Sequence, residues 1–509
     1  MKRRAFLWGS AASLALPPVM SRAQDQDAEH RLIETARAIA GRPYRPDTTK
    51  LSAPFERANY DSYRGIRTRP GVSGDLALGS DYRADLLPPG WLFREPVAIG
   101  LPGHDTRFSP ALYTFDQRYF TADAATQDAA DMGFSGLRLR HRLNVPDRWD
   151  DVLVLQGASY FRALAKDTVY GLSARALALG TGGPAPEEFP RFTRIEVFGT
   201  QADLRFGCLI DSTRASAALV ATLRPGTRTV LECALHLFPR VPLADAGIAP
   251  LTSMFQHSDM GPARIDDFRP AVHDSDTLVI DNGAGERLWR PLANPAQVQM
   301  SAFSDSGPRG FGLVQMPTDF ERFRDQEGAY HRRPSGFVTP RGDWGAGAVM
   351  LLEIPTENEF ADNIVVFWRP DRVLDPGAHR FDYRLDFTAP GPATLPPRPE
   401  PLSPVRSASG LEPNAGDARL FVIDYTETGP MPDMSGARLE VAGAAPGAVT
   451  GEALYPLAAR AEGWRASFVF TPRPGQEVAE LRLRLRAQDG TPLAPVWLHR
   501  WTRTVDGGV

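Results

Sequence analysis

The sequence predicts an all-β protein: a large N-terminal antiparallel β-sandwich followed by a small C-terminal immunoglobulin-like β-sandwich. Three observations support this prediction. Short apolar runs with alternating pattern recur along most of the chain, separated by turn signals such as Arg224-Pro225-Gly226. Helix signals are few. The 509 residues exceed what one hydrophobic core usually holds, and a stretch rich in Pro and Ser divides them.

The first residues carry the features of an export signal. Arg3 and Arg4 precede a weakly apolar run, and Ser21-Arg22-Ala23 matches a small-x-small cleavage pattern. The run is too short, and too rich in Ser, Gly and Pro, to span about 30 Å of hydrocarbon, which argues against a membrane anchor. We therefore expect residues 1–23 to be a twin-arginine export signal and the protein to reside in the periplasm.

The predicted N-terminal domain, residues 24–390, begins with a helix over Ala28–Ala40, in which Leu32, Ala36 and Ile39 share one face. Many short antiparallel strands follow, and they suit a large sandwich with an extended groove across one sheet better than a small barrel. The clearest predicted strands are Thr193–Phe198, Ala202–Asp211, Ala217–Leu223, Thr229–Phe238, Thr277–Asp281 and Ile364–Trp368.

Residues 412–509 predict a second, smaller sandwich. About seven short strands in roughly 100 residues is the spacing of an immunoglobulin-like domain, although the Cys–Trp–Cys pattern of antibody domains is missing. Between the two domains, residues 391–411 show no apolar periodicity and predict a Pro-rich, semi-rigid linker. The best strands after it are Leu420–Tyr425, Ala437–Val441, Ala448–Ala453, Ala466–Phe470, Glu480–Ala487 and Val496–Thr502.

Composition excludes several functional classes. The net charge of −4 argues against a polyanionic partner such as nucleic acid. The nine His are scattered and the two Cys are not clustered, so we expect no metal site and no cofactor. Cys208 and Cys233 lie in predicted strands of one meander, where a disulfide and a buried free pair both fit.

Carboxylates are the remaining candidates for catalysis. The chain has no GxSxG elbow, phosphate-binding glycine loop, GxGxxG or HExxH motif. Glycoside cleavage needs only two carboxyl groups, one to protonate the leaving oxygen and one to activate water or attack the sugar. The segment from Tyr330 to Pro370 combines charged and flat aromatic residues, as a sugar-binding site requires. The sequence alone does not choose among four acids, each of which also fits a turn or a cap: Asp274, Asp276, Asp343 and Asp362.

Several segments together identify a known family. They occur in the same order as in that family and cover almost the whole chain. The segments are Gly157–Arg162, Tyr170–Arg175, Glu187–Arg191, Ala249–Phe255, His273–Ser275, Trp289–Leu292, Glu353–Thr356 and Asp362–Val365 with Trp368. The chain resembles the periplasmic glucans biosynthesis proteins G and D (the OpgG/OpgD, or MdoG/MdoD, family). The twin-arginine signal is similar to that of the D branch.

This resemblance implies an inverting glycoside hydrolase that acts on β-1,2-glucan, the backbone of osmoregulated periplasmic glucans. It implies that Asp362 is the general acid and Asp274 the base, with exchanged roles left open, and that both converge on one cleft. Tyr330 matches a substrate-contacting tyrosine. Asp343 matches a position where the family accepts Glu, which suits sugar binding or structure. A transglycosylase that branches or cyclises the same backbone, and a non-catalytic glucan-binding assembly protein, remain alternatives.

The remaining candidates would line a sugar-binding groove as ring platforms and hydroxyl donors, although each also suits core packing. They are Tyr330, Arg332, Arg333, Trp344, Trp289 and Tyr160. Two roles fit His273, which would either orient its neighbour Asp274 or be a buried structural histidine. The expected partner is a β-1,2-glucan oligo- or polysaccharide, and the sequence leaves open a membrane glucan synthase and a homodimer.

Overall fold

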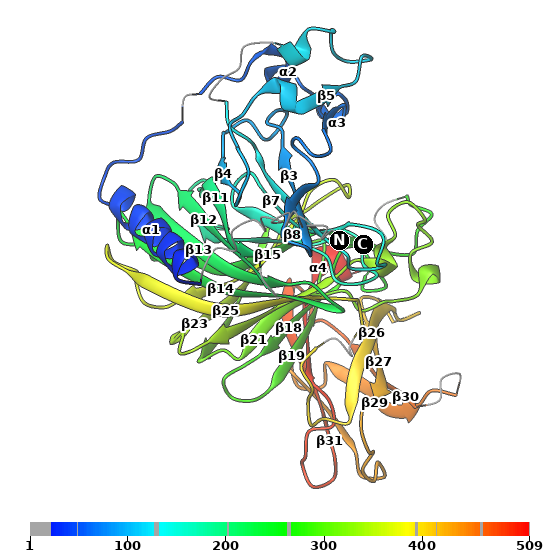
Figure 1. Ribbon diagram of the computed structural model, residues 1–509. Coiled ribbons are helices and arrows are strands. Elements are labelled where there is room, and N and C mark those ends of the chain that lie inside the picture. Colours follow the sequence, from blue (N-terminus) through cyan, green and yellow to red (C-terminus); the bar gives the residue numbers. More distant parts are fainter. Residues whose placement is uncertain are drawn as a thin grey trace, which may run out of the picture.

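The computed structural model describes residues 22–47, 49–126, 132–200, 203–261, 266–391, 395–413, 415–458 and 462–507. Two large β-sheets form most of the molecule, and the C-terminal strands lie at one end of them (Figure 1). The all-β prediction is confirmed. The predicted export signal lies almost wholly outside the described residues.

The first large sheet has 11 strands. Its strands in order are β2 (Leu76–Leu78), β3 (Tyr82–Leu87), β6 (Gly136–His141), β7 (Asp150–Gln156), β8 (Tyr160–Ala163), β9 (Ser173–Arg175), β15 (Ala246–Ser253), β24 (Ile364–Pro370), β23 (Ala346–Glu353) and β20 (Gln299–Ser306), with β10 (Leu177–Leu179) also paired to β15.

The second sheet has 13 strands and runs on into the C-terminal region. Its strands in order are β28 (Arg438–Ala442), β31 (Val478–Arg486), β32 (Val496–Thr502), β19 (Arg287–Pro291), β18 (Thr277–Asp281), β21 (Gly310–Val314), β22 (Ser335–Arg341), β25 (His379–Thr388), β14 (Arg228–Pro239), β13 (Ala215–Arg224), β12 (Leu204–Asp211), β11 (Arg191–Thr200) and β4 (Ala98–Gly100). The parallel pairs in this sheet are β11 with β4 and β19 with β32.

The core between the sheets follows from the two-residue period of a strand. In β6, Leu137 and Leu139 are fully buried in the main core, whereas the alternate residues Arg138 and Arg140 are half-buried on the other face. Burying one such leucine stabilises the fold by roughly 1.5–3 kcal/mol. The outer face of the 11-stranded sheet is therefore free to carry polar side chains along β6 to β9.

Helices and short strands border the sandwich. In α1 (Arg22–Ala40), Leu32 and Ala36 are buried against Phe198 and Phe238 of β11 and β14, which confirms the predicted helix and its apolar face. The other elements are α2 (Ala53–Glu56), α3 (Tyr60–Arg64), α4 (Arg503–Asp506), the pair β1 (Ile66–Thr68) and β5 (Tyr113–Phe115), the pair β16 (Phe255–His257) and β17 (Val272–His273), and the 3-10 turns η1 (Pro110–Leu112), η2 (Ala124–Thr126), η3 (Phe320–Arg322) and η4 (Tyr330–Arg332).

The C-terminal sandwich places a four-stranded sheet over β28, β31 and β32, and β18, β19, β21 and β22 also contribute side chains to its core. Its strands are β26 (Leu402–Leu411), β27 (Arg419–Glu427), β30 (Gly463–Phe470) and β29 (Val449–Pro456). Strand β26 lies inside the segment predicted as linker, so the connection between the domains ends before Leu402. Pro404 is accommodated because the register of β26 shifts between Pro404 and Arg406, where a ladder is irregular.

The two sandwiches share a sheet. In the parallel pair of β19 and β32, Trp289 lies opposite Trp497. Glu286 also accepts a hydrogen bond from Arg482 at 2.8 Å, and Asp259 accepts one from Arg406 at 2.7 Å. The C-terminal sandwich is therefore continuous with the large one.

Replacing Trp289 tests this continuity. The side chain is 2% exposed and packs in the core of the C-terminal sandwich. We expect Trp289→Ala to lower the free energy of unfolding by about 3–5 kcal/mol in a single transition, because the cavity opens where the sandwiches join. Urea unfolding followed by circular dichroism and by fluorescence measures this. Trp149→Ala is the control. Its half-buried ring lies beneath Arg83, so its loss should lower the free energy of unfolding by only about 1 kcal/mol. Two separate transitions in the native protein would contradict the shared sheet.

The cysteines are free and buried. Cys208 on β12 pairs with Leu219 of β13, and Cys233 on β14 pairs with Ala221 of the same strand. Strand β13 therefore separates the two cysteine strands. Of the two alternatives for this pair, the structure has the free thiols.

Candidate active site

The backbone brings Asp362 and Asp274 to the same end of β15. Ile364, which opens β24, pairs with Ser253, the last residue of β15. On the other side, the backbone N–H of Asp274 donates to the carbonyl of Met254 at 2.8 Å. Two acids that are far apart in the sequence therefore flank one strand end.

Asn363 fixes this junction. Its Oδ1 accepts from the backbone N–H of Phe255 at 2.8 Å, and its Nδ2 donates to the carbonyl of Phe255 at 2.9 Å. The side chain is 2% exposed, so these bonds are protected from water. The residue next to Asp362 is thus held rigidly against the strand that leads towards Asp274.

Asp274 is a buried carboxyl, only 6% exposed. Burial raises its pKa to about 6; Arg333 opposes this effect, and the negative charge of Asp362 adds to it. Arg333 Nη1 lies 3.1 Å from Asp274 Oδ1, an ion-pair distance. The two aspartates are therefore close enough for the charge of one to act on the other.

Asp362 has a more open environment, with 24% of its side chain exposed. Ser173 Oγ, on β9, donates to Asp362 Oδ2 at 3.3 Å. Arg162 Nη2, on β8, lies 3.7 Å from the same oxygen. Asp362 thus faces the polar surface of the 11-stranded sheet.

Tyr330 and Arg333 stand next to the aspartates. Ala329, in the left-handed region with φ +46°, starts the short turn η4 that carries Tyr330. Tyr330 Oη donates to Glu359 Oε2 at 2.8 Å, and the guanidinium of Arg333 lies 4.8 Å from the centre of the Tyr330 ring. Burial, together with Glu359, raises the pKa of Tyr330, so the phenol stays protonated. It acts here as a fixed hydrogen-bond donor.

His273 is a positioning group. It is 1% exposed, and burial lowers its pKa to about 3, so the ring is neutral. Gln315 Nε2 donates to the carbonyls of His273 and Tyr330, both at 2.9 Å, which leaves Gln315 Oε1 to accept from His273 Nδ1 at 2.7 Å. The proton therefore sits on Nδ1. Gln315 links the segment that ends in Asp274 to the turn that carries Tyr330.

Tyr160 also lies in this region. It is half-buried on β8, and the guanidinium of Arg175 lies 5.1 Å from its ring centre. Burial raises the pKa of Tyr160, and the charge of Asp362 contributes. Its neighbour two residues on, Arg162, contacts Asp362 directly.

Four predicted site residues make contacts away from the aspartate pair, although Arg332 lies in the same turn η4 as Tyr330. Trp344 is 4% exposed and donates to the carbonyl of Asp382 at 3.2 Å, so it packs the core and presents no face to a ligand. Trp289 is buried where the two sandwiches join. Arg332 is exposed, and its Nε donates to the carbonyl of Asp167 at 3.1 Å. The residue type alone does not reveal whether an aromatic or Arg side chain is buried in the core or exposed to a ligand.

Asp343 occupies the turn between β22 and β23, which connects the two large sheets, away from the aspartate pair. Its Oδ1 accepts from the backbone N–H of Gly345 at 2.7 Å. Gly347 of β23 pairs with Pro370, and Glu353 pairs with Ile364. Asp343 therefore lies near the Pro370 end of β24, one strand length from Asp362. Asp276, the fourth acid, accepts from the backbone N–H of Met316 at 3.0 Å and ties two segments together.

Sequence reasoning missed the residues that hold the pair in place: Arg162, Ser173, Arg269, Gln315 and Glu359. Arg162 and Ser173 fall inside segments that carry the family resemblance, and that was their only signal. Arg269 and Glu359 lie on separate loops and meet only through the fold, with 2.7 Å between Arg269 Nη1 and Glu359 Oε2.

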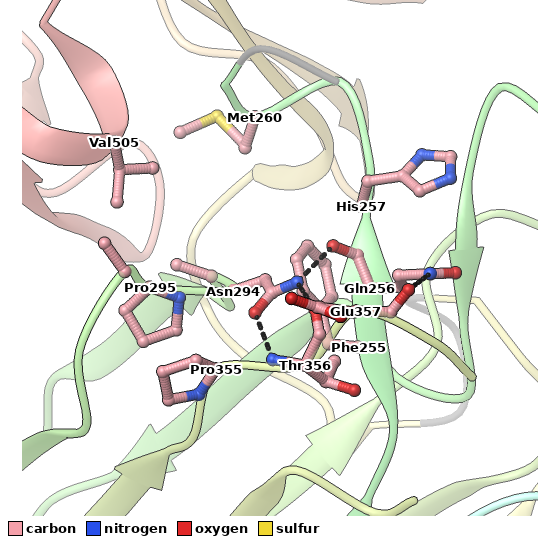
Figure 2. A pocket seen from close by; sticks show the side chains of 12 residues that line it. Phe255, Gln256, His257, Met260, Asn294, Pro295, Pro355, Thr356, Glu357 and Val505 are labelled. Atoms are coloured by element: carbon pink, nitrogen blue, oxygen red, sulfur yellow. Dashed lines mark hydrogen bonds between the residues drawn. The ribbon is translucent and has the colours of Figure 1, made fainter. Parts of the chain in front are cut away.

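A pocket of about 610 Å³ lies close by (Figure 2). It is bounded by β16, by the segments that hold Asn294 and Thr356, and by Val505 of α4, and neither aspartate lines it. The Asn294 side chain bridges the backbones of Gln256 and Thr356 at its wall (Figure 2). Segment 355–362, which carries Thr356 at one end and Asp362 at the other, connects the pocket to the aspartate pair.

Within the described part of the chain, no group of three or more His, Cys, Asp or Glu is placed to hold a metal ion. No helix there is long and apolar enough to cross a membrane. The aspartate site is thus built from carboxylates, arginines and aromatic rings.

The fold and site define an all-β sandwich protein with two aspartates on either side of one strand end. Residues 28–501 match the family described as "Periplasmic glucan biosynthesis protein, MdoG". A Glucans biosynthesis protein G of Vibrio cholerae serotype O1 is 42% identical over 482 residues, covering 92% of this chain and 86% of that protein. One from Shewanella baltica (strain OS195) is 40% identical over 488 residues, with the same two coverages.

The chain belongs to the periplasmic glucan biosynthesis protein family. Membership confirms the predicted family, the periplasmic location and a role in glucan biosynthesis. The two relatives described above carry the name of protein G. The D-branch assignment depends on a twin-arginine segment outside the described residues, and it stays a prediction.

Proposed function

We propose that this protein is a glycoside hydrolase that cleaves β-1,2-glucan with inversion, using Asp362 and Asp274. The observation that carries the proposal is the placement of the two aspartates on either side of the end of β15, with Asp274 buried and Asp362 partly exposed. Around them, the partly exposed side chains of Tyr160, Arg162 and Arg333 supply a ring and donors for a sugar chain. Tyr330 is 3% exposed, so its contribution is to hold Glu359 in place.

The two carboxyl groups have environments suited to different roles. With a pKa of about 6, Asp274 is mostly ionised at neutral pH yet still basic enough to accept a proton from water. Asp362 is 24% exposed and faces the polar side of the 11-stranded sheet, so a sugar chain can reach it, as the donor of a proton to the leaving oxygen requires.

Every proton and bond is accounted for in the proposed step. Asp362 gives its proton to the glycosidic oxygen as that bond breaks. Water adds to the anomeric carbon from the opposite face, and its proton passes to Asp274. Inverting enzymes usually separate the two carboxyl groups by roughly 6.5–9.5 Å to admit the water. A larger gap would require a relay through further waters or sugar hydroxyls.

The pH profile tests the role of Asp274. A base with a pKa of about 6 is protonated below that pH, so kcat/KM should fall about tenfold per pH unit below it. Arg333 lowers this pKa, and therefore Arg333→Gln should move the acidic limb to higher pH. Rates of glucan cleavage between pH 4 and 8 measure both effects. An acidic limb that stays in place in Arg333→Gln would remove Asp274 from the proton transfer.

A second enzymatic function, transglycosylation of the same backbone, is separated by its products. Incubating purified protein with linear β-1,2-glucan should raise the number of reducing ends if water is the acceptor. Changed product masses without that rise would favour transfer. Binding without any product would favour an assembly protein. A membrane glucan synthase and a second copy of the chain remain the proposed partners to test.

A further inference from the structure

Two phenylalanines near the aspartate pair are almost fully exposed. Phe268 is 78% exposed and Phe360 is 89% exposed. Each follows or precedes a charged residue of the site: Phe360 comes directly after Glu359, and Phe268 directly before Arg269. Phe360 is also only two residues from Asp362.

An ionic frame connects the loops that carry these rings. Arg269 Nη1 lies 2.7 Å from Glu359 Oε2 and 2.7 Å from Asp325 Oδ2, and its Nη2 lies 2.7 Å from Asp267 Oδ2. The Arg269 side chain is 14% exposed, so the frame is shielded from water although the rings are not. Glu359 in turn accepts from Tyr330 Oη.

The same frame orients the Phe268 ring. The guanidinium carbon of Arg269 lies 5.9 Å from the ring centre. One face of Phe268 thus rests near the cation that binds Glu359, and the other is left to solvent. The two loops therefore present their rings from a common support that also positions Tyr330.

We propose that Phe268 and Phe360 form an aromatic platform that binds glucose rings of the glucan chain beside the aspartate pair. This inference rests on the proposed function, because it takes the same glucan as ligand. An aromatic ring without polar groups contacts the apolar C–H face of a sugar and leaves hydroxyl recognition to the charged neighbours. The position of Phe360, two residues from partly exposed Asp362, argues for the substrate as the occupant rather than a second copy of this chain.

The test measures affinity separately from turnover. In an Asp362→Asn background, which should leave the glucan intact, linear β-1,2-glucan is titrated by calorimetry against the Phe268→Ala and Phe360→Ala variants. We expect each to weaken binding about tenfold, with little change in thermal stability because both rings are exposed. Phe360→Tyr, which keeps a flat ring, should bind like the parent.

Tyr119→Ala is the matched control. Tyr119 is 46% exposed and, like Phe268, is stacked by a neighbouring arginine, with the Arg118 carbon 5.4 Å from the ring centre. It follows β5, outside both large sheets. Its loss should leave glucan affinity unchanged.

The outcomes separate the two proposals. Glucan binding without cleavage by the native protein would defeat the catalytic proposal, and the affinities would still decide the platform. Cleavage with unchanged affinity in both Phe variants would overturn the platform alone. A change of oligomeric mass with unchanged affinity would assign the rings to contact between copies and overturn it as well. No binding of glucan by the parent would overturn both.

Discussion

Asp362→Asn is expected to lower the rate of β-1,2-glucan cleavage by about 10²–10⁴-fold, the contribution of a general acid. The protein should stay folded, because the replaced carboxyl is partly exposed and an asparagine there can still accept a hydrogen bond from Ser173 and lie beside Arg162. Initial rates of reducing-end formation measure the loss, and a thermal unfolding curve checks the fold.

Asp343→Asn is the matched control for this variant. Asp343 is an acid of the same segment, but it lies in a turn near the other end of β24. Its replacement should leave the rate within about twofold. Full activity in Asp362→Asn, or an equal loss in both variants, would exclude Asp362 as the specific proton donor.

Asp274→Asn is expected to be as inactive as Asp362→Asn but more stable than the native protein at neutral pH. The carboxyl of Asp274 is 6% exposed, and its pKa rises from 3.8 to about 6 on folding. A shift of about 2 units corresponds to about 3 kcal/mol as an upper bound. The shift already includes the opposing effect of Arg333, so the net gain should lie between zero and about 3 kcal/mol.

The sign of the pH dependence follows from the direction of the shift. A carboxyl whose pKa is raised in the folded state contributes its full stability below pH 3.8, and this stability is lost as pH rises through about 6. Urea unfolding at pH 5 and pH 7.5 should therefore show a smaller difference in Asp274→Asn than in the native protein. An unchanged difference, or a variant less stable than the native protein at pH 7.5, would contradict a strained, ionised Asp274.

The strands were predictable because apolar and polar residues alternate along a strand when one of its faces is buried. Thr277–Asp281 and Val496–Thr502 match β18 and β32 at both ends. Strand β26 was missed because Ser and Pro dominate it and because Pro404 sits at an irregular register. The shared sheet was not predictable, because the residues of β19 and β32 do not indicate that these two strands pair with each other.

The site was predictable only in part, for a related physical reason. The resemblance singled out Asp274, Asp362 and Tyr330, which lie in one region. Trp289 and Trp344 were chosen because aromatic rings suit sugars, yet the same rings suit a core, and only the fold separates the two uses. The contact between Arg269 and Glu359 was not predictable, because it joins two loops about 90 residues apart.

The anomeric form of the first product tests the central claim most directly. Purified protein is mixed with linear β-1,2-glucan, and the new reducing ends are followed by proton NMR before they equilibrate. Inversion at a β-linkage predicts that the α-anomer appears first, and that its appearance is lost in both Asp274→Asn and Asp362→Asn. Initial release of the β-anomer, or products that persist in either variant, would contradict inversion by this pair.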